Sequence, residues 1–151
     1  TRGQKELTMK KALFLMLVLL VAAGAVFAQG MWKDGTYTAE ADAFTRGWKN
    51  MVSITVVNGY ITMVHFDAIP EGGGMYKYVS SAVGEYGMVA NSDAQSEWHV
   101  QVDAAAAELV KQQDPAALTR NAGAVDAISG VSVTIMPHFE LAQEALRKAR
   151  R

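Results

Sequence analysis

The amino-acid sequence predicts an α+β domain, in which a small antiparallel sheet with a β-hairpin packs against two or three helices. The segments that favour strands come first along the chain and the helical segments follow, without the strand–helix alternation of a parallel sheet. Two of the strand segments are separated by Asn58-Gly59, a dipeptide typical of two-residue hairpin turns. A doubly wound fold is disfavoured, because no glycine-rich phosphate loop joins an early strand to a helix.

The beginning of the chain is typical of an export signal. From Met9 the sequence continues with two lysines, an apolar run over residues 12–21 and small residues ending at Ala28. We therefore expect residues 9–28 to be a signal peptide and residues 1–8 to be an extension upstream of it. The mature protein would be periplasmic or extracellular. Membrane association through an uncleaved leader is the alternative.

Composition excludes several classes of function. Removing residues 1–28 takes away four Lys/Arg and one Glu and leaves 123 residues, enough for a single domain with its own core. The remaining 10 basic and 14 acidic residues give a net charge of −4, which does not favour nucleic-acid binding. The absence of cysteine excludes disulfides, thiolate metal sites and iron–sulfur clusters.

The predicted strands occupy residues 35–41, 51–57 and 60–66. A two-residue turn pairs Val57 with Tyr60, and this register determines which side chains share a face. The expected core face carries Val52, Ile54, Val56, Ile61, Met63 and His65. The opposite face would carry Ser53, Thr55 and Thr62. Residues 75–89 show no clean period and predict no particular element.

A helix is predicted over residues 93–113, with Ser92 or Asp93 as its cap and Asp114-Pro115 as its stop. Its apolar side chains follow helical spacing: Trp98, Val102, Ala106, Leu109 and Val110. A short turn is expected over residues 116–123. A terminal helix begins near Pro137, since proline is tolerated in a first turn. Its apolar stripe consists of Phe139, Leu141, Ala142, Ala145 and Leu146.

The chain offers few side chains for catalysis or metal binding. His65, His99 and His138 are too scattered in sequence to predict a metal site. A nucleophile arrangement of Ser129, His138 and Asp126 is disfavoured, because no Gly-x-Ser-x-Gly turn accompanies it. Six aromatic residues either belong to the core or stack on a planar ligand. They are Trp48, Tyr60, Tyr76, Tyr78, Tyr86 and Trp98.

The stretch before the terminal helix is the one place where the sequence indicates a specific chemistry. It reads Asp126-Ala127-Ile128-Ser129-Gly130-Val131-Ser132-Val133-Thr134. Its hydroxyl side chains end just before the expected helix start, where free N–H groups and the helix dipole favour an anion. The residues alone leave two interpretations open: a site for a phosphate-bearing ligand, or a loop that only caps the last helix.

This stretch resembles the flavinylation motif of the FMN-binding domain family, whose pattern is D-x-x-[ST]-G-A-[ST]-x-[ST]. Residues 34–40, Gly47-Trp48-Lys49, Asn58-Gly59 and Phe66-Asp67 also resemble the start of this domain in its small secreted members. The likeness extends to about Leu146, and we assign residues 34–151 to the domain. The family includes the Rnf G and Nqr C subunits of membrane redox pumps and secreted flavoproteins of extracellular electron transfer.

The resemblance implies that Thr134, the last hydroxyl of the motif, bears FMN through a phosphoester. The rest of the cofactor-binding loop would be Asp126, Ser129, Gly130, Val131, Ser132 and Val133. A separate Mg-dependent flavin transferase with FAD as donor would attach the group. The protein would then relay electrons to redox partners at the cell envelope, with no catalytic or metal-binding residue of its own.

Two other hypotheses stay open, the first of them because Val131 stands where the family prefers alanine. One is a periplasmic domain that binds FMN or another small ligand without a covalent bond and carries no electrons. The other is an envelope interaction domain with a degenerate site.

Overall fold

A computed structural model of the chain describes residues 30–120 and 128–151. The predicted extension over residues 1–8, the predicted signal peptide over residues 9–28 and the motif residue Asp126 lie outside the described residues. The domain over Met31–Arg151 forms one unit. Within the described part of that domain, no helix is both long and apolar enough to cross a membrane.

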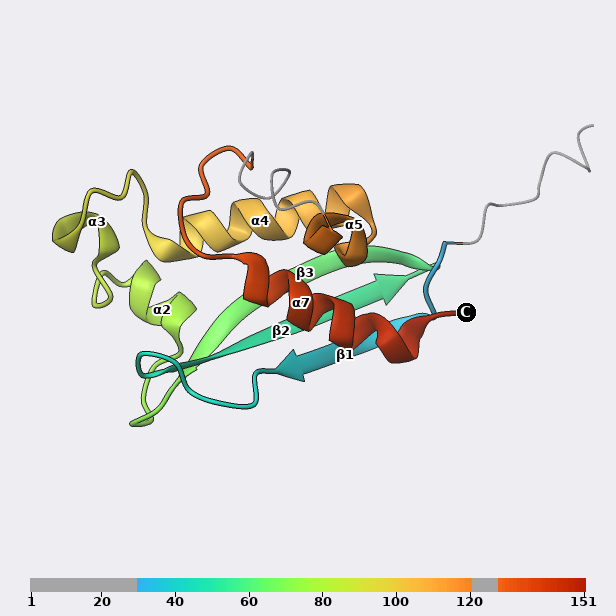
Figure 1. The fold of residues 1–151 in the computed structure, drawn as a ribbon, viewed down its shortest axis with the longest axis horizontal. Coiled ribbons are helices and arrows are strands. Elements are labelled where there is room, and N and C mark those ends of the chain that lie inside the picture. The colour runs from blue at the N-terminus through green and yellow to red at the C-terminus, as the bar shows by residue number, and fades with distance from the viewer. Residues whose placement is uncertain (1–29, 121–127) are drawn as a thin grey trace, which may run out of the picture. The chain divides into compact units, whose positions relative to one another are not determined.

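The sheet has three antiparallel strands in the order β1 (Gly35–Glu40), β2 (Trp48–Val57) and β3 (Tyr60–Pro70) (Figure 1). The hairpin prediction is confirmed, since Val57 pairs with Tyr60. Asn58 and Gly59 have φ angles of 54° and 81°, as a type I′ turn requires. The Asp34 carboxylate accepts hydrogen bonds from the N–H groups of Asn58 (2.9 Å) and Gly59 (2.7 Å) and so holds the turn from outside.

The prediction of the core face is correct for only part of the hairpin. Four of the six side chains are at most 2% exposed: Val52, Ile54, Val56 and Ile61. The other two predictions are wrong, because Met63 is 63% exposed and the His65 side chain is 43% exposed.

A β-bulge explains this difference. Val56 pairs with Ile61, but the preceding residue Thr55 pairs with Met63, so Thr62 is an extra residue on β3. An extra residue reverses the alternation of faces beyond it. Val64 and Phe66 therefore point to the core in place of Met63 and His65.

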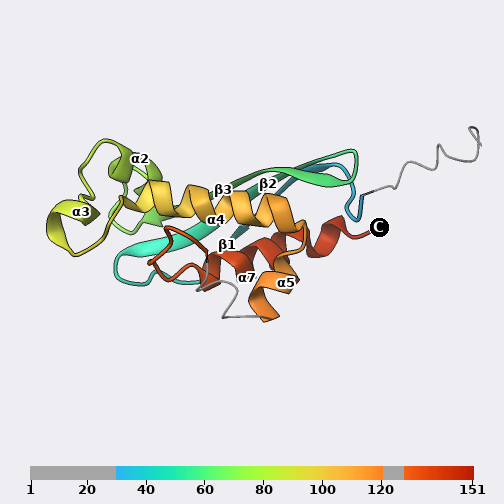
Figure 2. The same cartoon turned by 90° about the horizontal axis from the view of Figure 1, so that it is seen from above.

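Two helices run along one face of the sheet (Figures 1 and 2): α4 (Trp98–Gln112) and α7 (Met136–Ala145). Shorter helices are α2 (Lys77–Ala82), α3 (Met88–Asn91) and α5 (Pro115–Arg120), and a 3-10 turn (Leu146–Ala149) follows α7. The predicted stripe of the terminal helix is confirmed, since all five of its side chains are buried. The arrangement confirms the predicted α+β class.

The start of α4 differs from the prediction by five residues. The helix begins at Trp98, and Glu97 is its N-cap in an extended conformation. The Glu97 carboxylate accepts hydrogen bonds from the first two N–H groups of α3 (2.7 and 3.2 Å). Ser92 and Asp93 therefore belong to the connection between α3 and α4 and do not cap α4.

The predicted stop of α4 is confirmed. Gln113 ends the helix with a left-handed φ of 61°, and Asp114-Pro115 follows. The turn expected over residues 116–123 is the helix α5, as far as the described residues extend.

Trp32 joins the two ends of the domain. Its indole N–H donates to the carbonyl of Gln113 (3.0 Å) and its backbone N–H to that of Gly59 (3.2 Å). The Arg151 guanidinium in turn donates to the Trp32 carbonyl (2.7 Å). Trp32 is only 2% exposed, so the first and last residues of the domain are fastened to the same end of the core.

Candidate functional site

The described part of the motif loop contains a tight turn before α7. The Val131 N–H donates to the Ile128 carbonyl (3.2 Å), and Gly130 has a left-handed φ of 80°. A Cβ on Gly130 would meet no atom within 4 Å, so the requirement for glycine is conformational and not steric crowding. Ser129 is exposed beside it.

Val131 is partly buried and packs against the hydrophobic core. Its extra carbons relative to alanine therefore face the interior of the domain. The departure from the family pattern at this position is accommodated by packing, on the side of the loop away from solvent.

Gln101 holds the middle of the motif loop. This residue lies on α4, and it is 1% exposed. Its Oε1 accepts hydrogen bonds from the Ser132 N–H (2.7 Å), the Ser132 hydroxyl (3.1 Å) and the Val133 N–H (3.1 Å). Its Nε2 donates to the Ser96 carbonyl (3.0 Å). One buried side-chain amide thus satisfies three donors of the loop.

Gln101 is not among the residues predicted from the sequence. The available signal was a polar residue at a core-facing position of α4, three residues after Trp98 and four before Ala105, both of which are buried. A buried amide needs hydrogen-bond partners, and here they lie 31 and 32 residues further along the chain.

Thr134 lies between two fixed points. The N–H of the preceding Val133 is bonded to Gln101, and the following Ile135 is 2% exposed. Thr134 itself is exposed. Its hydroxyl has no hydrogen bond to any residue within the described ranges. The fold therefore holds the backbone of this threonine while its side chain remains accessible.

The start of α7 offers fewer free N–H groups than the sequence suggests. Pro137 stands at the second helical position and has no N–H, and the N–H of His138 donates to the Ile135 carbonyl (2.9 Å). The N–H groups of Ile135 and Met136 form no hydrogen bond with any of the described residues, so these two are left to face an anion at this end. An anion near Thr134 would gain from the helix dipole but from few direct hydrogen bonds.

His138 lies in the first turn of α7 and is 3% exposed. Its Nε2 lies 3.2 Å from the Asp67 carbonyl oxygen, so Nε2–H donates this bond. Its Nδ1 is buried without a partner. Burial lowers the pKa of His138 to about 4, and the positive charge of Lys77 acts in the same direction. The imidazole is therefore neutral near pH 7, with an unused acceptor nitrogen, and neither ring nitrogen is bonded to Ser129.

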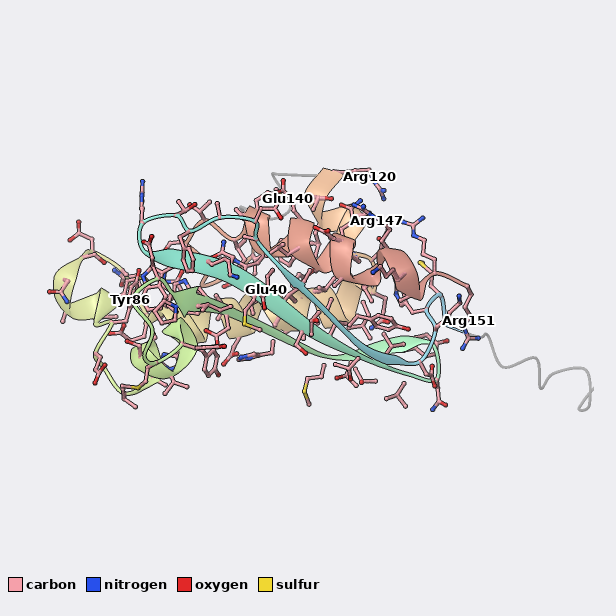
Figure 3. All side chains as sticks on the ribbon, turned by 90° about the horizontal axis from the view of Figure 1, so that it is seen from below. Glu40, Tyr86, Arg120, Glu140, Arg147 and Arg151 are labelled. Carbon is pink, nitrogen blue, oxygen red and sulfur yellow. The ribbon has the colours of Figure 1, made fainter. Side chains whose placement is uncertain are left out.

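Three aromatic rings surround the ammonium group of Lys77, the first residue of α2. The Lys77 Nζ lies 4.4 Å from the ring centroid of Tyr86, 4.9 Å from that of Trp98 and 5.3 Å from that of Trp48. We call these four residues the aromatic–lysine cluster. Among the residues that the structure describes, no carboxylate forms an ion pair with Lys77. The cluster lies at the end of the domain that carries α2 and α3, where Figure 3 shows Tyr86.

His138 lies beside the cluster and close to the motif in sequence. The Trp98 ring lies 5.9 Å from the His138 ring, and His138 is four residues after Thr134. Of the six aromatic residues named from the sequence, the fold brings together Trp48, Tyr86 and Trp98. Lys77 was not predicted, because nothing local distinguishes it from a solvated lysine.

The remaining aromatic residues lie elsewhere. Tyr78 packs between the rings of His65 (5.0 Å) and His99 (5.8 Å). Tyr60 and Tyr76 are each 44% exposed.

The other two histidines have partners of their own. His65 Nε2 lies 3.3 Å from the Asp67 carboxylate, and this hydrogen bond raises the pKa of His65, with burial acting against it. His99 Nδ1 lies 2.9 Å from the Ser81 hydroxyl. Within residues 30–120 and 128–151, no three His, Asp or Glu side chains group in a way that could hold a metal ion.

No family model matches the chain, and no curated protein is similar to it. Two solved clostridial structures are similar. A crystal structure of a Clostridium perfringens protein is 22% identical and covers 79% of this chain and 89% of its own, with a TM-score of 0.53, which shows the fold alone. A Clostridium thermocellum protein solved by NMR is 41% identical and covers 77% of this chain and 91% of its own, with a TM-score of 0.54. With that identity over nearly the whole length of the relative, the chain belongs to the same family as the Clostridium thermocellum protein.

Proposed function

We propose that this protein is an exported flavoprotein of the FMN-binding domain family that carries FMN on Thr134 and relays electrons outside the cytoplasmic membrane. The observation that carries the proposal is the placement of Thr134. Its hydroxyl is exposed, while Gln101 and the burial of Ile135 fix the backbone on either side. Such a residue suits modification by a separate enzyme, which must reach the side chain in a defined position.

The attachment is a phosphoryl transfer. The Thr134 oxygen forms a bond to the FMN phosphorus of FAD, the pyrophosphate bond of FAD breaks, and AMP leaves with the electron pair. The hydroxyl proton passes to a base of the Mg-dependent flavin transferase, because no described side chain of this protein contacts the Thr134 hydroxyl as a base.

The residues near the motif fit a flavin. The aromatic–lysine cluster offers the partly exposed rings of Trp48 and Tyr86, and an ammonium group with which no carboxylate among the described residues pairs. When bound, FMN supplies the redox chemistry. Lys77 would stabilise negative charge on the reduced ring.

The same cluster supports a second candidate function, the non-covalent binding of FMN or another planar ligand. The rings of Trp48 and Tyr86 and the Lys77 ammonium group are independent of any bond to Thr134. Covalent attachment is favoured over this candidate because Val131 packs into the core and does not crowd the exposed side of the loop.

The deciding experiment is co-expression with a flavin transferase, followed by intact mass and in-gel flavin fluorescence under denaturing conditions. The wild type should be labelled and Thr134→Ala should not. Thr38→Ala, which removes another exposed threonine on β1, is the matched control and should be labelled fully. Fluorescence that persists in Thr134→Ala would sink the proposal. An unlabelled wild type that binds added FMN would establish the non-covalent candidate.

Three further measurements examine the rest of the proposal. Asp126 would help to present the motif to the transferase or its metal, so a folded Asp126→Ala protein that is fully labelled would contradict this role. The labelled wild type should be reduced and reoxidised by artificial donors and acceptors, while Thr134→Ala stays inert. N-terminal mass analysis of protein from the cell envelope should place the mature start at Gln29.

A further inference from the structure

We propose that Gln101 is the positioning residue that prepares the acceptor loop for modification, an inference that rests on the proposed function of Thr134. Gln101 does not reach the acceptor itself. It holds the two residues before it, through the Ser132 N–H (2.7 Å) and the Val133 N–H (3.1 Å). Its effect on the reaction would therefore act through the conformation of the loop.

Gln101 holds the loop from inside the domain. The amide is 1% exposed, so solvent cannot replace its hydrogen bonds without opening the loop. Its Nε2 is anchored on the Ser96 carbonyl (3.0 Å), which orients Oε1 toward the loop. A third bond, from the Ser132 hydroxyl (3.1 Å), explains why a hydroxyl residue suits this motif position.

Val131 and Val133 pack partly against the core, but few hydrogen bonds other than those of Gln101 hold the loop between its turn and α7 within the described residues. The turn itself is closed by one backbone bond, from the Val131 N–H to the Ile128 carbonyl (3.2 Å). The burial of Ile135 restrains the far side. Without Gln101, Ser132 and Val133 would lose the only hydrogen bonds that the described residues provide to their N–H groups. The loop would then sample open conformations, and the conformation that the transferase recognises would be populated only part of the time.

This mechanism predicts a particular kinetic signature. A recognised conformation that is populated only in part raises the apparent KM by the inverse of its population and leaves kcat unchanged. We expect Gln101→Met to raise the KM of the transferase for this protein about tenfold, the change that about 1.4 kcal/mol produces. The kcat of labelling should stay within about twofold of the wild type. Hydrogen exchange of the Ser132 and Val133 amides should accelerate in the same variant.

Gln113 provides a matched control. Its amide also bonds the backbone, accepting from the Ile61 N–H (2.7 Å) and donating to the Ile61 carbonyl (2.8 Å), but it does not contact the motif loop. Gln113→Met removes a comparable amide from the other end of α4 and should leave the KM unchanged. Gln101→Glu keeps an oxygen that accepts from the loop donors, so its KM should lie between those of the wild type and Gln101→Met.

Three outcomes would overturn the inference. The first is a KM for Gln101→Met within twofold of the wild type, and the second is an equal rise in Gln113→Met. The third is an equal KM for Gln101→Met and Gln101→Glu, which would show that an acceptor oxygen at this position does not hold the loop. If Gln101→Met does not fold, Gln101→Asn, whose amide is one methylene too short to reach both partners, takes its place with the same expected rise.

Failure of this inference is distinguishable from failure of the proposed function. A wild type that the transferase never labels overturns the proposed function and this inference together. A wild type that is labelled, alongside a Gln101→Met protein with an unchanged KM, overturns only the role of Gln101.

Discussion

Lowering the pH should reduce the free energy of unfolding of this domain, because His138 is buried as a neutral side chain. A free histidine titrates near pH 6.5, whereas burial lowers the pKa of His138 to about 4 in the folded protein. The unfolded chain therefore binds a proton more readily than the folded chain. The contribution of neutral His138 to the free energy of unfolding is complete above pH 6.5 and is lost as the pH falls toward about 4.

The size of the effect follows from the two pKa values. Their difference corresponds to about 3 kcal/mol in total, of which about 2 kcal/mol is lost by pH 5. His138 is only 3% exposed, so solvent screening does not reduce this figure. Losing it would remove a considerable fraction of the stability of a typical small domain, which is about 5–15 kcal/mol.

Urea denaturation at pH 7.5 and pH 5 would measure this loss in the wild type and in His138→Gln. The glutamine keeps an N–H donor for the Asp67 carbonyl but does not titrate. The wild type should lose about 2 kcal/mol more than the variant between the two pH values. His65 is the control of opposite sign. Its raised pKa stabilises the folded protein below pH 6.5 and that contribution is lost as the pH rises, so His65→Gln should steepen the acid loss.

The reasoning would be refuted if wild type and His138→Gln lost the same stability to within about 0.5 kcal/mol. That result would mean that His138 is protonated in the folded protein at pH 5, and that its buried Nδ1 finds a partner when it is charged.

Two further predictions concern the turns. Asp34→Ala should lower the free energy of unfolding by about 1 kcal/mol, because the carboxylate bonds two N–H groups of the hairpin turn, while Asp34→Asn should retain much of this stability; an unchanged urea midpoint in the alanine variant would contradict the prediction. Gly130→Ala should cost about 1 kcal/mol, since φ is 80° and the added methyl meets no atom, and Gly130→Asn should cost less because asparagine tolerates this conformation. A higher melting temperature for Gly130→Ala than for Gly130→Asn would show that the turn relaxes in the variants.

The sequence predicted well those features that are decided within a few residues. The Asn58-Gly59 turn, the stop after α4 and the stripe of α7 depend on backbone preferences and on the spacing of apolar side chains. The fold class followed from the order of these elements. The exposed position of Thr134 just before α7 also agrees with the local pattern, since the helix begins two residues later.

The features that were missed depend on contacts outside the local pattern of each element. The start of α4 shifts because Glu97 bonds the N–H groups of α3, and no local pattern reveals that contact. The bulge at Thr62 moves the apolar alternation from Ile61 to Val64 and Phe66, so it moved Met63 and His65 off the expected face.

The candidate site shows the same limit. Gln101 is separated from its loop partners by more than thirty positions, and Lys77 lies between rings from β2, α4 and the segment after α2. Sequence patterns could identify the loop and could not identify what holds it.

Because Trp32 fastens the first and last residues of the domain together, both of its termini lie at one end, and the aromatic–lysine cluster lies at the other. Trp32 and Arg151 meet beyond the last turn of α7, while Thr134 precedes its first turn, so about 15 Å of helix separates them. Figure 3 shows Arg151 at one end of the domain and Tyr86 at the other. An affinity tag or surface linker joined directly before Met31 or after Arg151 would extend from the end of the domain that carries both termini. Immobilised that way on an electrode or a sensor chip, the domain would turn its aromatic–lysine cluster toward the solution.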